Sequence, residues 1–165
     1  MDTLNQLFRL YKETNKIKVP EQQQMSSQSL QFGDVLEIYT HNRLLIVVVV
    51  SDSEALLMSE FTELATHTDF IVHVDHPISD TWIIETNQRL YLTPQTKYNI
   101  CCTLDQQTKT VLKDILAGSP VPIQKSGPKI PPNPKDPRMK FKLEELEKTM
   151  LVNKHLFYEE EEEGT

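Results

Sequence analysis

Residues 44–50 read Leu-Leu-Ile-Val-Val-Val-Val, and Ser51 and Asp52 follow immediately. Five of these seven apolar residues are β-branched, which favours a strand over a helix. The run is too short to span a bilayer, because a membrane-spanning helix needs about 20 apolar residues. A continuous apolar run, unlike an alternating one, is typical of a strand that is buried on both faces. The run therefore predicts a strand at the centre of a sheet or inside a small barrel.

Other segments with strand character lie on both sides of this run: 35–40, 70–75, 82–85, 89–92 and 98–102. In the segment that begins at Phe70, apolar and polar residues alternate, as in a strand with one buried face. The break at 86–88 separates two predicted strands, and residues 54–66 fit either a short helix or a strand with a loop. Five or six short strands at this spacing predict a small SH3-like barrel or a curved antiparallel sheet.

Helical periodicity occurs in three segments. Residues 2–13 carry one apolar stripe, with Asp2 as a candidate N-cap. Residues 104–117 predict the helix that closes the barrel, beginning with a capping box of Thr103 and Gln106 and ending at Gly118. From Leu143 a narrower apolar stripe predicts a helix that fits the groove of a partner.

These elements divide the chain into four parts. Residues 1–31 are an N-terminal helical arm with a polar linker, and 32–118 are the β-barrel domain with its closing helix. Residues 119–142 form a linker rich in proline and lysine, and 143–165 form a C-terminal amphipathic helix with an acidic tail. Three roles are open for the linker lysines: binding to RNA or to an acidic surface, pairing with the acidic tail, or simple exposure to solvent. The fold class expected is mainly β, of β+α type, with two helical arms.

The charge distribution bears on the choice of partner. The chain has a net charge of −7, and positions 33–99 hold ten acidic residues against three basic ones. Such a domain is poorly suited to a phosphate backbone and favours a basic protein partner, unless the acids serve only solubility. With four well-separated glycines the chain has no glycine-rich phosphate loop, so nucleotide chemistry is not expected.

The cysteines and the apolar segments indicate a compartment. Cys101 and Cys102 are adjacent, and neighbouring residues cannot easily reach disulfide geometry. A reduced, cytoplasmic environment is therefore expected. No signal peptide is recognisable among the first fifteen residues, and no membrane contact is expected.

Four short motifs in residues 32–117 carry a family likeness: FGDV at 32–35, SD at 51–52, WIIET at 82–86 and TL at 103–104. In this order the segment resembles the growth-inhibitor toxin family typified by MazF and PemK. The resemblance implies a compact SH3-like barrel, commonly dimeric, that cleaves single-stranded RNA without a metal ion. An antitoxin peptide usually wraps the surface of such proteins.

The resemblance also implies catalytic residues. Cleavage in that family relies on an arginine just before the second strand and on a serine or threonine after the third. By position, Arg43 matches the first role and Thr62 matches the second. Family members usually have proline after that arginine, whereas Leu44 stands there in this chain.

A second candidate site is the sequence His73-x-Asp75-His76. On a strand His73 and Asp75 share one face, a spacing that suits two ligands of one metal ion. His76, His41 or His67 would have to supply the third ligand, and exposed strand residues are the simpler interpretation. Cys101 and Cys102 are likewise candidates for a redox or metal pair, or for ordinary thiols at a strand end.

We therefore predict a non-enzymatic protein-interaction module on a toxin-like barrel, as part of a toxin–antitoxin-like system. The alternative is a metal-independent endoribonuclease that uses Arg43 and Thr62. The expected partners are a basic protein and a second copy of the chain, with RNA only under the alternative. No cofactor is expected.

Overall fold

The computed structural model describes residues 2–14, 30–40, 43–94, 96–129 and 133–163. Six antiparallel strands form one sheet in the order β4-β5-β3-β2-β1-β6. The strands are β1 (Asp34–Thr40), β2 (Arg43–Ser51), β3 (Glu54–Ser59), β4 (Asp69–His73), β5 (Thr81–Tyr91) and β6 (Tyr98–Thr103). The α-helices are α1 (Asp2–Thr14), α2 (Gln106–Leu116) and α3 (Pro137–Glu163), and two 3₁₀ turns are η1 (Thr62–Leu64) and η2 (Ile123–Lys125).

β2 contains the apolar run and lies between β1 and β3, as predicted. Its side chains are buried on both faces of the sheet. Val48 belongs to the hydrophobic cluster that includes Leu112 of α2, and its neighbour Val47 belongs to a second cluster with Leu90 of β5. The alternation along β2 thus joins two cores, which explains why this strand needs no polar positions.

The sheet is curved and open, which is one of the two architectures predicted. Over the described residues, β4 and β6 are edge strands with one partner each, so the strands do not close into a barrel. β5 is continuous where two strands were predicted. Its register against β3 shifts between the pairs Met58↔Ile84 and Leu56↔Arg89, so residues 85–88 bulge out of the ladder. A bulge of this kind bends the strand without ending it.

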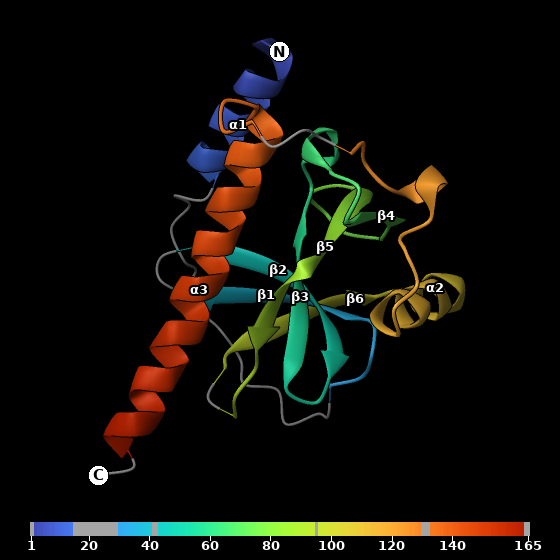
Figure 1. Ribbon diagram of the computed structural model, residues 1–165. Helices are drawn as coiled ribbons and strands as arrows, with labels where there is room; N and C mark the ends of the chain where they lie inside the picture. Colours follow the sequence, from blue (N-terminus) through green and yellow to red (C-terminus); the bar gives the residue numbers. More distant parts are fainter. Residues whose placement is uncertain (1, 15–29, 41–42, 95, 130–132, 164–165) are drawn as a thin grey trace.

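α2 covers one face of the sheet, and Leu112 is fully buried there (Figure 1). Its N-cap is Asp105, whose carboxylate accepts a hydrogen bond from the Thr108 amide at 2.7 Å. The predicted capping box at Thr103 is therefore wrong, because the Thr103 hydroxyl donates to Asp34 on β1 instead. The predicted end at Gly118 is confirmed: this glycine has a φ of +113° and follows the last turn of the helix.

α1 and α3 lie side by side on the other side of the molecule (Figure 1). Both helices pack on η1, and α3 also packs on β5, so the two predicted arms are docked on the sheet. The Tyr11 ring lies edge-on to Phe61 at 5.7 Å and to Phe141 at 4.9 Å, between ring centroids. Lys12 and Glu144 form an ion pair across the two helices, at 3.4 Å.

α3 begins at Pro137 rather than at Leu143, which corrects the predicted boundary after residue 142. Asp136 caps it, because its carboxylate accepts the Arg138 amide at 2.9 Å. The backbone of the helix continues to Glu163, through the run predicted as an acidic tail. The proposed cap at Asp2 lies outside the described side chains.

The proline-rich segment before α3 is attached to the sheet edge. Ser126 forms a bridge with Phe70 of β4, and the Gly127 amide donates to the Thr66 carbonyl at 2.9 Å. A Cβ atom at Gly127 would lie 2.3 Å from the backbone of Ala65, so no larger residue fits this contact. Over the described residues, no helix combines the length and the hydropathy needed to cross a membrane.

Candidate functional site

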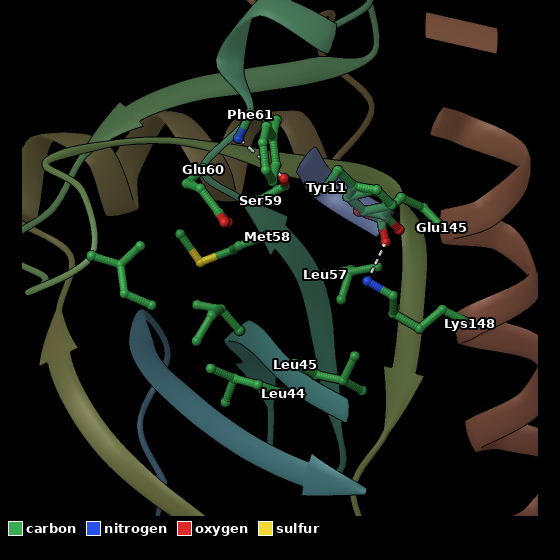
Figure 2. Close-up of a pocket in the computed structure, with 12 residues that line it drawn as sticks. Tyr11, Leu44, Leu45, Leu57, Met58, Ser59, Glu60, Phe61, Glu145 and Lys148 are labelled. Carbon is green, nitrogen blue, oxygen red and sulfur yellow. Dashed lines mark hydrogen bonds and ion pairs between the residues drawn. The ribbon is translucent and has the colours of Figure 1, made fainter. Parts of the chain in front are cut away.

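A pocket of about 220 Å³ lies between the ends of β2 and β3 and the two terminal helices (Figure 2). Most of its wall is apolar, and its polar residues are Tyr11, Ser59, Glu60, Glu145 and Lys148. The apolar residues are Leu44, Leu45, Ile46, Leu57, Met58, Phe61 and Ile78. An apolar pocket with a few convergent polar groups is the usual form of a small-molecule site.

α3 supplies an ion pair to this pocket. The Lys148 ammonium lies 3.1 Å from Oε2 of Glu145, and the two side chains are 7% and 1% exposed. The same ammonium lies over the Tyr11 ring, 4.8 Å from its centroid. The two charges compensate one another, because they are one helical turn apart and buried together.

Glu60 follows β3 and lies on the side of the pocket away from this ion pair (Figure 2). Burial raises the pKa of the Glu60 carboxyl, and its own backbone amide and the Lys148 charge oppose that effect. The Lys148 ammonium is shared, because it also pairs with Glu145. The neighbouring Ser59 hydroxyl accepts the Phe61 amide at 3.2 Å. The pocket therefore holds two carboxyl groups, those of Glu60 and Glu145, against one ammonium.

A second group of buried charges fastens α3 to the sheet. Lys142 contacts Asp69 of β4, and its ammonium lies 3.1 Å from Oε1 of Glu85 on β5. Both carboxylates are fully buried. Burial raises the pKa of Glu85 well above its usual range, and the charge of Glu145 adds to this effect. Lys142 thus attaches α3 to β4 and β5, whereas Oε2 of Glu85 is buried without a hydrogen-bond partner among the described residues.

Glu37, His76 and Cys101 form the group of potential metal ligands that the described residues bring together. The Cys101 thiol donates to Oε1 of Glu37 at 3.1 Å, and Nε2 of His76 lies 3.3 Å from the same oxygen. Burial and the hydrogen bond to Glu37 raise the pKa of Cys101 well above its usual range. The thiol is therefore protonated and is a poor nucleophile.

The imidazole of His76 is held through its Nδ1, which accepts the Ile78 amide at 3.0 Å. Its Nε2 is buried and lies 3.3 Å from Oε1 of Glu37 without forming a hydrogen bond. The cluster thus consists of the Cys101–Glu37 hydrogen bond and a contact between His76 and Glu37.

The predicted metal ligands do not converge. His73 ends β4 and is exposed, as is Asp75, whereas His76 turns inward to Glu37. Within the described ranges, His73 and Asp75 belong to no group of three ligands. Sequence spacing placed them on one face, but it did not show that the chain turns at Pro77.

The predicted catalytic pair lies on separate elements. Arg43 opens β2 opposite Thr40 of β1, and Thr62 opens η1. No hydrogen bond or ion pair joins Arg43 to Thr62 among the described residues. Their neighbours Leu44 and Phe61 both line the pocket, whereas neither predicted residue does.

A more open groove of about 560 Å³ lies beside the end of α2. Among its polar side chains, Thr86 donates to the Thr68 carbonyl at 2.6 Å, and Arg89 pairs with Glu54 at 2.5 Å.

Comparisons with protein-family models, with curated proteins and with solved structures each returned no match to this chain. The fold therefore defines the class of protein: a β-dominant α+β protein with an open, six-stranded antiparallel sheet and three α-helices. Its candidate site is the pocket between the sheet and the terminal helices.

Sequence reasoning missed the polar residues of this pocket. Glu145 and Lys148 have the i, i+3 spacing of a helical ion pair, and this signal was available. Nothing local indicates that Tyr11 and Glu60 meet them, because these residues come from widely separated segments.

Proposed function

We propose that the chain is a non-enzymatic protein-interaction module that associates with a second copy through the outer surface of α3. The observation that supports this is an apolar stripe, which comprises Met139, Leu143, Leu146 and Met150. Leu143, Leu146 and Met150 are 50%, 42% and 61% exposed. The opposite side of the helix is used for docking, since Phe141 is fully buried there.

The spacing of the stripe favours a helical partner. The steps from Met139 to Met150 are four, three and four residues, which is the repeat of the a and d positions of a coiled coil. An amphipathic helix fills such a seam with side chains at the same spacing. A second α3 offers that spacing itself.

A two-fold axis between Leu143 and Leu146 would place the two copies of α3 antiparallel. Leu143 would then pack on Leu146 of the second copy, and Met139 on Met150. Lys140 and Glu147 are exposed on the same flank of the stripe. In the antiparallel pair each lysine faces a glutamate of the other copy, so the flanking charges are complementary.

The family resemblance adds support of a different kind. Growth-inhibitor toxins of the MazF and PemK type are commonly dimeric and bind antitoxin peptides. The excess of acidic residues over positions 33–99 also suits a basic protein partner. We therefore propose that the module belongs to a toxin–antitoxin-like system in the cytoplasm. The four short motifs within residues 32–117 support this extension.

Sedimentation equilibrium of the full chain tests self-association. We expect a monomer–dimer equilibrium, and we expect Leu146→Glu to weaken it at least tenfold because the variant buries a charge in the seam. Ile123→Glu is the matched control, since Ile123 is 91% exposed and lies away from α3. A monomer at all concentrations, or equal effects of both variants, would contradict the proposal.

An RNA assay separates this proposal from the ribonuclease alternative. Long single-stranded RNA is incubated in chelator with the protein and with its Arg43→Ala variant. We expect both preparations to leave the RNA intact. Cleavage by the parent that Arg43→Ala abolishes would overturn the non-enzymatic function.

A further inference from the structure

We infer that the pocket beside Glu60 binds a small organic ammonium ion, namely a primary amine that carries one aromatic ring. The inference is independent of the dimer proposed above. It depends on the size of the pocket, its apolar wall and the placement of its charges.

The volume of the pocket limits the size of the ligand. A cavity of about 150 Å³ accommodates benzene. The larger pocket here, of about 220 Å³, has room for one ring and a short chain. Ile78 lines the pocket and is 54% exposed, so the wall opens to solvent on that side. A ligand of this size can therefore enter without displacing α3.

The apolar wall defines what surrounds the ring. Leu45 and Leu57 are almost fully buried and lie on one side of the pocket, and Met58 and Phe61 lie on another. The Met58 thioether makes favourable contacts with the edge of an aromatic ring. Binding the ring there removes apolar surface from water on both partners.

The charges define the polar end of the ligand. The pocket is lined by two carboxyl groups, those of Glu60 and Glu145, and by one ammonium, that of Lys148, so its acidic groups outnumber its basic one. His76, in the loop after β4, lowers the pKa of the Glu60 carboxyl when its ring is charged. An ammonium group on the ligand would neutralise Glu60 and donate hydrogen bonds to it. A carboxylate ligand would be repelled, and a hydroxyl would supply no charge.

Isothermal titration calorimetry of the full chain at pH 8 tests this inference with three probes that share a 2-phenylethyl group. The probes are 2-phenylethylamine, 2-phenylethanol and 3-phenylpropanoate. We expect the amine to bind, the alcohol to bind at least tenfold more weakly, and the carboxylate to give no heat. No binding of the amine, or equal binding of the amine and the alcohol, would overturn the inference.

A variant then tests the role of Glu60. Glu60→Gln keeps the shape of the side chain and removes its charge. We expect it to weaken amine binding at least tenfold and to leave alcohol binding unchanged. Glu63→Gln is the matched control, because Glu63 is an exposed acid in the adjacent turn. Amine affinity that is equal in Glu60→Gln and the parent would overturn the assignment.

A measurement on the parent protein is independent of whether the variant folds. With methionine methyl groups labelled with ¹³C, the amine should shift the signal of Met58 in the pocket. The signals of Met139 and Met150 on α3 should stay in place, since these residues do not line the pocket. A shift of the α3 signals without a shift of Met58 would place the ligand elsewhere and refute the inference.

Discussion

The ammonium of Lys142 on α3 lies 3.1 Å from Oε1 of Glu85 on β5, and it also contacts Asp69 on β4. One cation thus joins a terminal helix to two neighbouring strands. Burial lowers the pKa of Lys142, but the charges of Glu85 and Asp69 outweigh that effect, so its pKa is raised and the amine is protonated. The stability of the α3 attachment therefore depends on charge compensation as well as on apolar packing.

Replacing Lys142 with methionine should be strongly destabilising. The variant leaves two buried carboxylates without a counter-charge, and removing one partner of a buried ion pair costs about 3–5 kcal/mol. Urea denaturation measures the free energy of unfolding. Lys97→Met is the control, because Lys97 is exposed in the loop before β6 and its loss should cost less than about 0.5 kcal/mol. Equal losses in the two variants would contradict this account.

Glu85→Gln should raise stability at pH 8 relative to the parent. The folded state raises the pKa of Glu85 above its ordinary value of 4.5, so the folded protein holds this proton more tightly than the unfolded chain does. The contribution of Glu85 to stability is complete below pH 4.5 and is lost as the pH rises through the raised pKa. Glutamine resembles the protonated form, and Asp69 still compensates Lys142.

Denaturation of the Glu85→Gln variant and the parent at pH 4 and pH 8 tests this prediction. The difference in the free energy of unfolding should be small at pH 4 and should favour the variant at pH 8. Glu63→Gln should show no such divergence, since Glu63 is exposed. A variant that is less stable than the parent at pH 8 would refute the assigned direction.

The proposed antiparallel α3 pair predicts charge complementation. Lys140→Glu or Glu147→Lys alone would place like charges on the flank of the seam. Two exposed pairs are worth about 1 kcal/mol together, so each variant should weaken dimerisation about fivefold. The double variant exchanges the charges and should restore the parent's affinity. Sedimentation equilibrium at low salt measures the effect, and failure of the double variant to recover would exclude this register.

Cys101 should react slowly with alkylating agents. Burial and the hydrogen bond to Glu37 raise the pKa of its thiol, so little thiolate is present at pH 8. Alkylation by iodoacetamide, followed by peptide mass spectrometry, should be about tenfold or more slower than for glutathione. Glu37→Gln removes the nearby negative charge and should accelerate Cys101. A Cys101 rate that is unchanged in this variant would contradict the role given to Glu37.

Asp105→Ala should lower the free energy of unfolding by about 1 kcal/mol, which is the usual cost of an N-cap. The hydrogen bond from the Thr108 amide lowers the pKa of Asp105 below its ordinary value of 3.8. Its stabilisation is therefore present above pH 3.8 and is lost as the pH falls through the lowered pKa. Asp114→Ala, in the last turn of α2, is the control and should cost nothing. Equal effects of the two variants would refute the cap.

Much of the fold could be predicted from local patterns. The apolar run in β2 and the glycine that ends α2 were recognised because their signals are confined to neighbouring residues. The start of α2 was misplaced because Thr103 is engaged by Asp34, which lies 69 positions earlier. β5 was divided because polar residues at 86–88 resemble a turn, whereas here they form a bulge within one strand.

The candidate site could not be predicted in the same way. Lys142 follows a proline-rich stretch and was assigned to the linker, and its partner Glu85 is 57 positions away. The pocket requires Tyr11, Glu60 and Lys148 to meet from three separate segments. Periodicity and composition describe one segment at a time, so they do not predict contacts between segments that are far apart in the sequence.

The separation of Glu85 from Lys142 also affects how the chain is made. At about 5–20 residues per second, Lys142 emerges roughly 3–11 s after Glu85 on a translating ribosome. During this interval two carboxylates, on the edge strand β4 and its neighbour β5, lack the counter-charge that Lys142 later supplies. Inward-pointing charges near an edge discourage pairing between strands of different chains. In the nascent chain the charges of Asp69 and Glu85 would therefore oppose aggregation until α3 is synthesised and Lys142 neutralises them.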